Sequence, residues 1–327
     1  MPLPALDAPQ PFVLLDDARE EGAAAARLFL DPLEIVVAMV PDDVPALLAT
    51  LDCWQAEDAL AAGFLCYEAG HALDSRLARL AAPLPDGTPL GWFARFARCE
   101  RVAQGDVAAL LPDPDGAWIG APQPQIDYPA YAERMETVLD HIRAGDIYQA
   151  NLTFPARVPM QGAPLAIYAR LRQHARAGYG AIVATGAHTL LSLSPELFFT
   201  LRDRQIIARP MKGTAARNAD AASDAAARHD LATDPKQRAE NLMIVDLIRN
   251  DLSRVAVPGS VAVPSLFRVE TYPTIHQMVS DVTATLRPDT SIGALLGSIF
   301  PCGSITGAPK LSAMAIIDRL ETAPRGA

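Results

Sequence analysis

Two side chains in the middle of the sequence could do chemistry on a carbon centre. Lys212 stands between apolar, strand-like residues and the turn formed by Gly213 and Thr214. Such a lysine is either a surface residue with its amine in water or a buried amine, and burial favours the neutral, nucleophilic form of an amine. Upstream, Glu196 lies at the mouth of an apolar strand, where a desolvated carboxyl can serve as a general acid.

A second candidate group lies on a predicted helix over residues 234–252. Asp234 suits the N-cap of this helix, Pro235 its first position and Gln237 the reciprocal capping position. Glu240 follows within two turns and is either part of a solvated face or a ligand for a hard cation such as Mg²⁺. We expect one stripe of this helix at Leu242, Val245, either Ile248 or Arg249, and Leu252.

The third candidate is a glycine-rich turn over residues 303–307 that leads into an amphipathic helix ending near Leu320. Free N–H groups at such a turn and the positive end of the helix dipole favour an anion such as a carboxylate, although a simple capped turn has the same sequence. The spacing does not match a P-loop. His276 lies in a neighbouring segment, outside any zinc pattern, and a structural role is its default interpretation.

The elements that must position these groups follow from the hydrophobic pattern. Buried strands are predicted at residues 13–15, 35–40 and 63–67, and helices at 45–61, 128–145 and 165–177. A strand is predicted at 146–158, further strands at 181–184, 190–193 and 197–201, and an exposed helix or flap at 215–233. A surface connection is expected at 81–87 and 104–125. The strands cluster instead of alternating with helices, which favours an α+β fold.

Composition excludes several classes of protein. The 327 residues are 50% hydrophobic and 20% charged with a net charge of −10, so we expect a globular chain that binds neither nucleic acid nor an anionic membrane. The first seven residues contain no signal-peptide pattern, and no apolar run is long enough to span a bilayer. The cysteines form no disulfide or zinc spacing, which favours a cytoplasmic protein; they are Cys53, Cys66, Cys99 and Cys302.

Four ordered blocks of this sequence together resemble the chorismate-utilising enzymes, which include anthranilate, aminodeoxychorismate, isochorismate and salicylate synthases. The blocks are residues 145–152, 210–214, 239–252 and 303–310. The resemblance extends from about residue 128 to the end and implies a single large α/β sandwich with antiparallel sheets, Mg²⁺ as cofactor and chorismate as substrate. It divides the chain into an N-terminal region, 1–120, and a chorismate-binding catalytic region, 121–327.

Two positions discriminate within this family. Where the isochorismate-type members of the family look to have a lysine base, this chain has Gln149. The resemblance therefore disfavours a reaction in which water is the nucleophile. Anthranilate synthases resemble the pattern Pro-Ile-Ala-Gly-Thr where this chain has Pro-Met-Lys-Gly-Thr at residues 210–214. With a lysine at this position, the pattern resembles that of the aminodeoxychorismate synthases, component I. The resemblance therefore implies conversion of chorismate and ammonia to 4-amino-4-deoxychorismate, on the path to p-aminobenzoate and folate, with ammonia supplied by a glutamine amidotransferase subunit.

The resemblance also assigns roles to individual residues. Lys212 would be the covalent nucleophile, Glu196 the acid and base for the leaving and entering groups, and His276 would lie beside the ring. Glu240 would bind Mg²⁺. The expected substrate-binding residues are Gln149, Gly213, Thr214, Gly303, Ser304, Thr306 and Gly307.

The sequence departs from the family pattern at its end. Residues 320–327 resemble the entry to a further segment with a Tyr, an Arg, a glycine-rich loop and a second Mg²⁺ glutamate, so we expect a C-terminally truncated, weakly active or inactive chain. The alternatives are anthranilate synthase component I and a non-catalytic remnant that only binds a partner subunit.

Overall fold

A computed structural model describes residues 10–20 and 22–327 of the chain. The expected absence of a signal peptide concerns residues that lie outside the described ones. The chain packs as two compact units, each assembled from separate stretches. Unit 1 comprises the chain up to Tyr131 with Thr153–Pro195 and Glu321–Ala327, and unit 2 comprises Ala132–Leu152 and Glu196–Leu320. The expected division into an N-terminal region, 1–120, and a catalytic region, 121–327, concerns regions of the sequence and stays a prediction.

Unit 1 is built on a six-stranded antiparallel sheet with the strand order β11-β10-β1-β2-β4-β3. Its strands are β1 (Phe12–Asp16), β2 (Ala26–Ala38), β3 (Ala61–Leu65), β4 (Gly91–Val102), β10 (Tyr179–Ala184) and β11 (Thr189–Ser194). Two short ladders pair β5 (Trp118–Ile119) with β9 (Met160–Gln161) and β6 (Gln123–Pro124) with β8 (Ala156–Arg157). Its helices are α1 (Val44–Ala56), α2 (Ala69–Ala72), α3 (Val107–Leu110) and α5 (Pro164–Ala175). Short 3₁₀ turns are η1 (Pro41–Asp43), η2 (Ala78–Leu80), η3 (Gln104–Asp106) and η4 (Pro114–Gly116).

Strand β1 lies inside the core of unit 1, which explains why most of its sequence is apolar. Leu14 packs into the buried cluster that contains Tyr168, whereas Val13 packs into a different cluster with Phe29, so both faces of β1 are covered by apolar side chains. Asp16, the last residue of β1, is fully buried as a side chain and is bound by the Arg172 guanidinium at 2.6 Å. Because a buried carboxylate needs a charged partner, this pair ties α5 to the end of β1.

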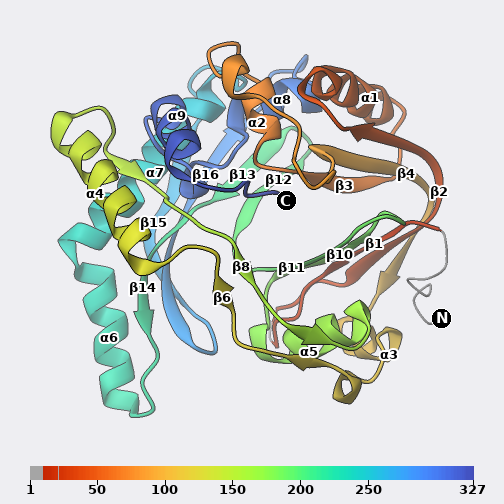
Figure 1. Ribbon diagram of the computed structural model, residues 1–327, viewed down its shortest axis with the longest axis horizontal. Helices are drawn as coiled ribbons and strands as arrows, with labels where there is room; N and C mark the ends of the chain where they lie inside the picture. Colours follow the sequence, from red (N-terminus) through yellow and green to blue (C-terminus); the bar gives the residue numbers. More distant parts are fainter. Residues whose placement is uncertain (1–9, 21) are drawn as a thin grey trace. The chain divides into compact units, whose positions relative to one another are not determined.

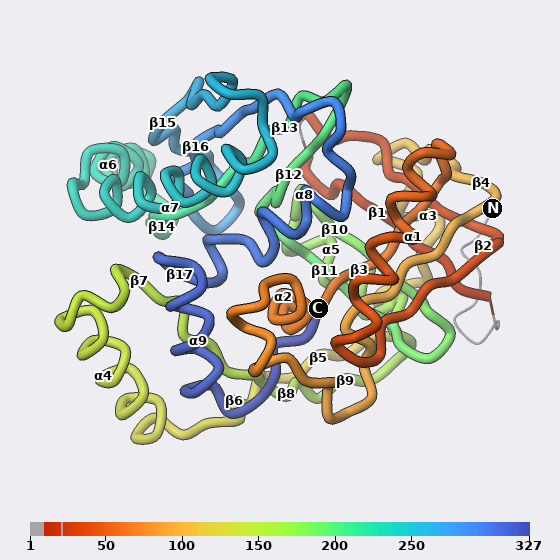
Figure 2. Tube along the Cα trace, turned by 90° about the horizontal axis from the view of Figure 1, so that it is seen from above, coloured from red at the N-terminus to blue at the C-terminus, as the bar shows by residue number. Residues whose placement is uncertain are grey.

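Unit 2 is built on a five-stranded antiparallel sheet centred on the long strand β16. Its strands are β12 (Leu197–Arg202), β13 (Gln205–Arg209), β14 (Met211–Ala216), β15 (Ala262–Thr271) and β16 (Ile275–Thr285). The helices are α4 (Tyr128–Ala144, which starts in unit 1), α6 (Ala221–Thr233), α7 (Pro235–Ser253), α8 (Ile292–Ile299) and α9 (Lys310–Leu320). A two-stranded ladder pairs β7 (Gln149–Ala150) with β17 (Gly307–Ala308), which follows the 3₁₀ turn η5 (Gly303–Ile305). Figures 1 and 2 show α6 and α7 beside β14, β15 and β16.

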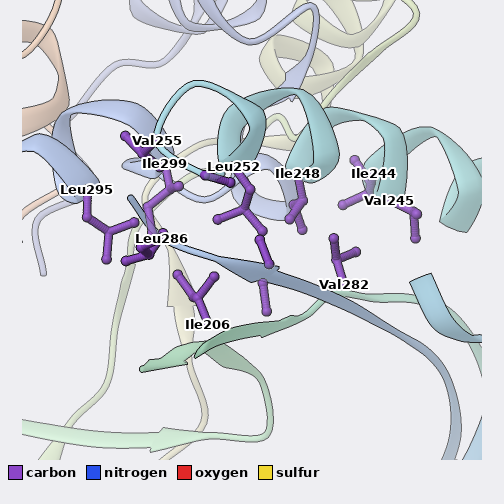
Figure 3. Close-up of a cluster of buried hydrophobic side chains, with 13 residues drawn as sticks. Ile206, Ile244, Val245, Ile248, Leu252, Val255, Val282, Leu286, Leu295 and Ile299 are labelled. Atoms are coloured by element: carbon purple, nitrogen blue, oxygen red, sulfur yellow. The ribbon is translucent and has the colours of Figure 1, made fainter. Parts of the chain in front are cut away.

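Helix α7 is the element that the sequence predicts best. The Asp234 carboxylate accepts a hydrogen bond from the Gln237 N–H at 2.8 Å, and Pro235 occupies the first turn, as its capping signals predict. Its buried face packs on the sheet in the cluster shown in Figure 3, and the members that α7 contributes are Ile244, Val245, Ile248 and Leu252. The predicted stripe was wrong at one position, because Leu242 is 42% exposed and Asn241 is buried in its place. Asn241 precedes Ile244 and Val245 by three and four residues and so shares their face.

The remaining expectations have mixed outcomes. The α+β class with antiparallel sheets is confirmed, since every strand pairing in the described part of the chain is antiparallel. The strand predicted at 146–158 was wrong, because only the short β7 and β8 form there and pair with different partners. The segment 215–233 divides between the end of β14 and the helix α6. Among helices of the described residues, none has the length and apolarity needed to cross a bilayer.

A buried ion pair fixes the start of α9. The Lys310 ammonium lies 2.6 Å from an Asp251 carboxylate oxygen and donates to the Ile299 carbonyl at 2.9 Å, and the two charged side chains are only 10% and 8% exposed. Burial raises the pKa of Asp251, while the Lys310 charge acts in the opposite direction. The Lys310 amine thus ties the first residue of α9 to the ends of α7 and α8.

We expect Lys310→Met to destabilise the protein by about 3–5 kcal/mol, because it leaves the Asp251 charge buried without its partner. The double variant Asp251→Asn/Lys310→Met should recover much of this loss. Urea denaturation followed by circular dichroism measures both. Arg249→Met is the matched control, since its pair with Asp246 is exposed and should contribute no more than about 1 kcal/mol. Equal losses from the two single variants would contradict this account.

Candidate active site

The site is organised around a β-bulge in β14. Met211 pairs with Val279 and Thr214 with Gln277, so three steps along β14 face two steps along β16, and Lys212 and Gly213 lie in the irregular part. Gly213 has φ +98°, a left-handed conformation that favours glycine. Bulges turn a side chain away from the regular alternation of a strand, and here the redirected residue is Lys212.

Lys212 and Glu196, the two residues predicted to carry the chemistry, lie close enough for the lysine charge to act on the carboxyl. Lys212 is half-buried, and its ammonium makes no hydrogen bond or ion pair with any residue that the structure describes. Glu196 precedes β12 and accepts a hydrogen bond from the Met211 N–H at 3.3 Å. Burial raises the pKa of Glu196, whereas the hydrogen bond from Ser304, that from Met211 and the charge of Lys212 act against it. The predicted desolvated carboxyl is therefore present beside the predicted amine.

The glycine-rich turn supplies the other wall of the site. Ser304 on η5 hydrogen-bonds Glu196 and lies 3.1 Å from the Cys302 sulfur. Burial raises the pKa of the Cys302 thiol, and the nearby Glu196 charge adds to the rise. Gly303 lies so close to α7 that a Cβ there would meet a Leu247 methyl at 2.5 Å. The turn, β12 and β14 thus meet at Glu196, which no spacing in the sequence could show.

Gln149 reaches the same turn through the β7–β17 ladder. Ala308 pairs with Gln149, and Gly307 has φ +152° with its α-carbon so close to β7 that a Cβ would meet the Gln149 carbonyl at 2.2 Å. Thr306 is fully buried, and its hydroxyl donates to the Gly303 carbonyl at 3.2 Å. The Gln149 side-chain oxygen is buried and has no hydrogen-bond partner among the described residues. The structure therefore brings the predicted binding residues Gln149, Gly303, Ser304, Thr306 and Gly307 together.

The predicted metal ligand, Glu240, is not part of a cluster of three or more metal-binding side chains among the described residues. Glu240 lies on α7 and is 39% exposed as a side chain, with the Lys236 ammonium 3.8 Å away. No group of three or more His, Cys, Asp or Glu side chains within the described residues is arranged to hold a metal ion. A lone carboxylate beside a lysine does not make a magnesium site by itself, because Mg²⁺ requires six oxygen ligands in octahedral geometry.

His276 is placed differently from the other predicted residues. It is 2% exposed, and its ring nitrogens lie 3.0 Å from the Thr271 hydroxyl and 3.0 Å from an Asp224 oxygen. Its strand partner in β14 is Ala215, beyond the bulge. Thr214, which is exposed, donates its hydroxyl proton to Gln277 at 2.8 Å. In this structure His276 links β16 to α6, and its predicted place beside the substrate ring stays a prediction.

Asn241 is the residue of the site that the sequence analysis missed. It follows Glu240 on α7, is fully buried, and its amide donates to the Lys212 carbonyl at 3.2 Å. The signal that could have revealed it is a polar residue at a buried position of an amphipathic helix, which must find partners inside the protein.

Comparison with known proteins identifies the family of this chain. The family model for chorismate binding enzymes matches residues 42–327. The chain belongs to this family. The candidate site lies wholly inside the matched range.

Two curated relatives describe the similarity more closely. The chain is 47% identical over 197 residues to aminodeoxychorismate synthase component 1 of Klebsiella aerogenes, which covers 60% of this chain and 44% of that protein. It is 36% identical over 200 residues to anthranilate synthase component 1 1 of Halobacterium salinarum, covering 61% of this chain and 38% of that protein. The chain thus spans less than half the length of the curated relatives that it matches.

A solved structure has the same fold. Anthranilate synthase component I of Streptococcus pneumoniae TIGR4 superposes with a TM-score of 0.76 over 94% of this chain and 79% of that chain, at 23% identity. The predicted fold of the chorismate-utilising enzymes is therefore confirmed.

We expect Gly213→Ala to destabilise the protein by about 1–2 kcal/mol, because the φ of Gly213 strains any other residue. A Cβ there would also meet the Gln237 side-chain oxygen at 3.1 Å and the Met278 Cβ at 3.3 Å. Gly259→Ala is the matched control, since Gly259 has φ +80° and nothing within 4 Å of an added Cβ. Urea denaturation should show a larger loss for Gly213→Ala, and equal losses would show that contacts at the bulge do not matter.

Proposed function

We propose that this chain binds chorismate and aminates it at C4 through a covalent adduct on Lys212, the reaction of aminodeoxychorismate synthase component I. The observation that carries this proposal is a single amine without a salt-bridge partner among the described residues, held on a glycine bulge beside the desolvated Glu196 carboxyl. The similarity to a relative named aminodeoxychorismate synthase component 1 supports the same reaction.

The first half-reaction uses the amine and the carboxyl together. The Lys212 nitrogen, in its neutral form, makes a bond to ring carbon C2, both ring double bonds shift by one position (C1=C2 to C1=C6 and C5=C6 to C4=C5), and the C4–O bond breaks. Glu196 in its protonated form delivers a proton to the departing hydroxyl, which leaves as water, and the positively charged nitrogen now bonded to C2 then gives a proton to the Glu196 carboxylate. Burial of Glu196 suits this role, because it favours the protonated carboxyl before the reaction.

The second half-reaction reverses the direction of attack. Ammonia forms a bond to C4, both ring double bonds shift back, and the C2–N bond to Lys212 breaks, while one proton passes by way of Glu196 from the new C4 ammonium group to the lysine nitrogen. The sum is chorismate plus ammonia giving 4-amino-4-deoxychorismate plus water. The Gly303–Gly307 turn and Gln149 would bind the anionic groups of chorismate, since backbone N–H groups at such a turn suit carboxylates.

We further propose that ammonia comes from a glutamine amidotransferase partner. The relative's name, component 1, supports the existence of a partner component. Anthranilate synthase activity is the alternative within the family. It would place nitrogen at C2, and Lys212 disfavours it because an amine bound at C2 blocks that carbon.

Lys212 gives the decisive test. Incubation with chorismate and no ammonia should add a chorismate-derived mass to the protein, and peptide mapping should locate it on Lys212. We expect Lys212→Ala to lower formation of the 4-amino product by at least about 10²-fold or to divert it to anthranilate. Lys236→Ala is the matched control, because Lys236 is 81% exposed.

The possible outcomes separate the candidate functions. Anthranilate as the main product of the unaltered chain would favour the alternative synthase. Binding of a partner subunit without an adduct, and with activity unaffected by Lys212→Ala, would identify a non-catalytic protein.

Magnesium is a further part of the proposal. Glu240 stays the predicted ligand, and since it does not complete a site alone, we propose that Mg²⁺ binds there only with the substrate. Mg²⁺ should therefore tighten chorismate binding in calorimetry by about tenfold, and Glu240→Gln should abolish this effect. Asp246→Asn is the control, because that carboxylate lies on the same helix in an exposed pair with Arg249. The same Mg²⁺ effect in both variants would remove Glu240 from the metal site.

A further inference from the structure

Within the described part of the chain, the buried face of α7 carries two polar side chains, Asn241 and the ion-paired Asp251 near the end of the helix. Its amide nitrogen lies 3.2 Å from the Lys212 carbonyl and 3.5 Å from the Met278 carbonyl, and its oxygen accepts from the Ser280 hydroxyl at 2.6 Å. The amide nitrogen therefore contacts both β14 and β16, and the amide oxygen contacts β16.

The contact with Lys212 falls where the sheet cannot supply a regular partner. A bulge removes backbone groups from the ladder, and a buried carbonyl without a donor costs about 1–3 kcal/mol. Asn241 donates to that carbonyl from the helix, so the position of the bulge relative to α7 depends on one side-chain amide. Gln237, one turn earlier, packs against Gly213 but makes no such bond in the described structure.

We propose that Asn241 is a positioning residue for Lys212: by holding the carbonyl of the bulge it fixes the direction in which the amine leaves β14, towards Glu196. The Ser280 hydroxyl holds the amide in the orientation that presents its N–H groups to the bulge. This inference rests on the proposed function only where it takes Lys212 as the nucleophile. The contact between Asn241 and the bulge does not depend on the reaction.

The composition of the chain makes the amine easy to follow. The sequence contains three lysines, Lys212, Lys236 and Lys310. Lys236 is exposed and serves as an internal reference, whereas Lys310 is held in the buried pair with Asp251. Limited acetylation with acetic anhydride at a series of pH values, followed by peptide mass spectrometry, gives the reactivity of Lys212 relative to Lys236.

Asn241→Asp keeps the shape of the side chain but replaces the donating NH₂ with an oxygen that faces two carbonyls. We expect the bulge to be released and the acetylation of Lys212 relative to Lys236 to rise by about fivefold, with a changed pH dependence. Ser280→Ala should produce a smaller rise in the same direction and provides a second variant if Asn241→Asp does not fold. Asn250→Asp is the matched control, because it makes the same substitution at an exposed position of α7.

A merely structural role gives a different result. A lower melting temperature for Asn241→Asp and Ser280→Ala, with Lys212 labelled relative to Lys236 as in the unaltered chain over the whole pH series, would overturn the proposal. With chorismate and ammonium, loss of positioning should also raise the fraction of nitrogen placed at C2, whereas simple destabilisation lowers both products equally. Absence of an adduct on Lys212 in the unaltered chain would contradict the proposed function and leave the labelling result to decide the role of Asn241.

Discussion

The packing of α7 on the sheet of unit 2 is the constraint on which the site depends. Its apolar face lies on Ile206, Val282 and their neighbours, and this burial fixes the helix both along and about its axis. The face continues into Asn241, so the same packing that stabilises the unit brings an amide to the Lys212 carbonyl. At the other end of the helix, Asp251 binds Lys310 and holds the chain that follows the glycine-rich turn. One helix therefore sets the positions of both walls of the site.

The bulge and the turn are two solutions to the same local problem. Each must bring a backbone closer to a neighbour than a side chain allows, and each has a glycine with positive φ at that point, Gly213 against Met278 and Gly307 against β7. A regular β14 would place Lys212 in strict alternation with its neighbours. The inserted residue breaks that alternation, and the glycine makes the break possible without strain.

The sequence predicts local features of this site well and remote contacts poorly. Features that depend on residues close together in the chain are found in the structure. They are the cap of α7, the turn conformation of Gly213 directly after Lys212, and the glycine-rich turn before α9. The strand expected at 146–158 failed because hydrophobic pattern cannot show that β7 and β8 pair with different partners. Asn241 was missed because hydrophobicity placed Leu242 in the stripe, and because its partner lies 29 residues away in sequence.

The electrostatics of the site follow from burial rather than from net charge. The chain has a net charge of −10, yet the amine of Lys212 has no ion-pair partner among the residues described. Glu196 is the nearby carboxyl, and burial favours its protonated form while the lysine charge favours the ionised form. In the proposed reaction, the Glu196 carboxyl accepts a hydrogen bond from the Met211 N–H and is hydrogen-bonded by Ser304, and its burial favours the protonated form that would deliver a proton to the leaving group.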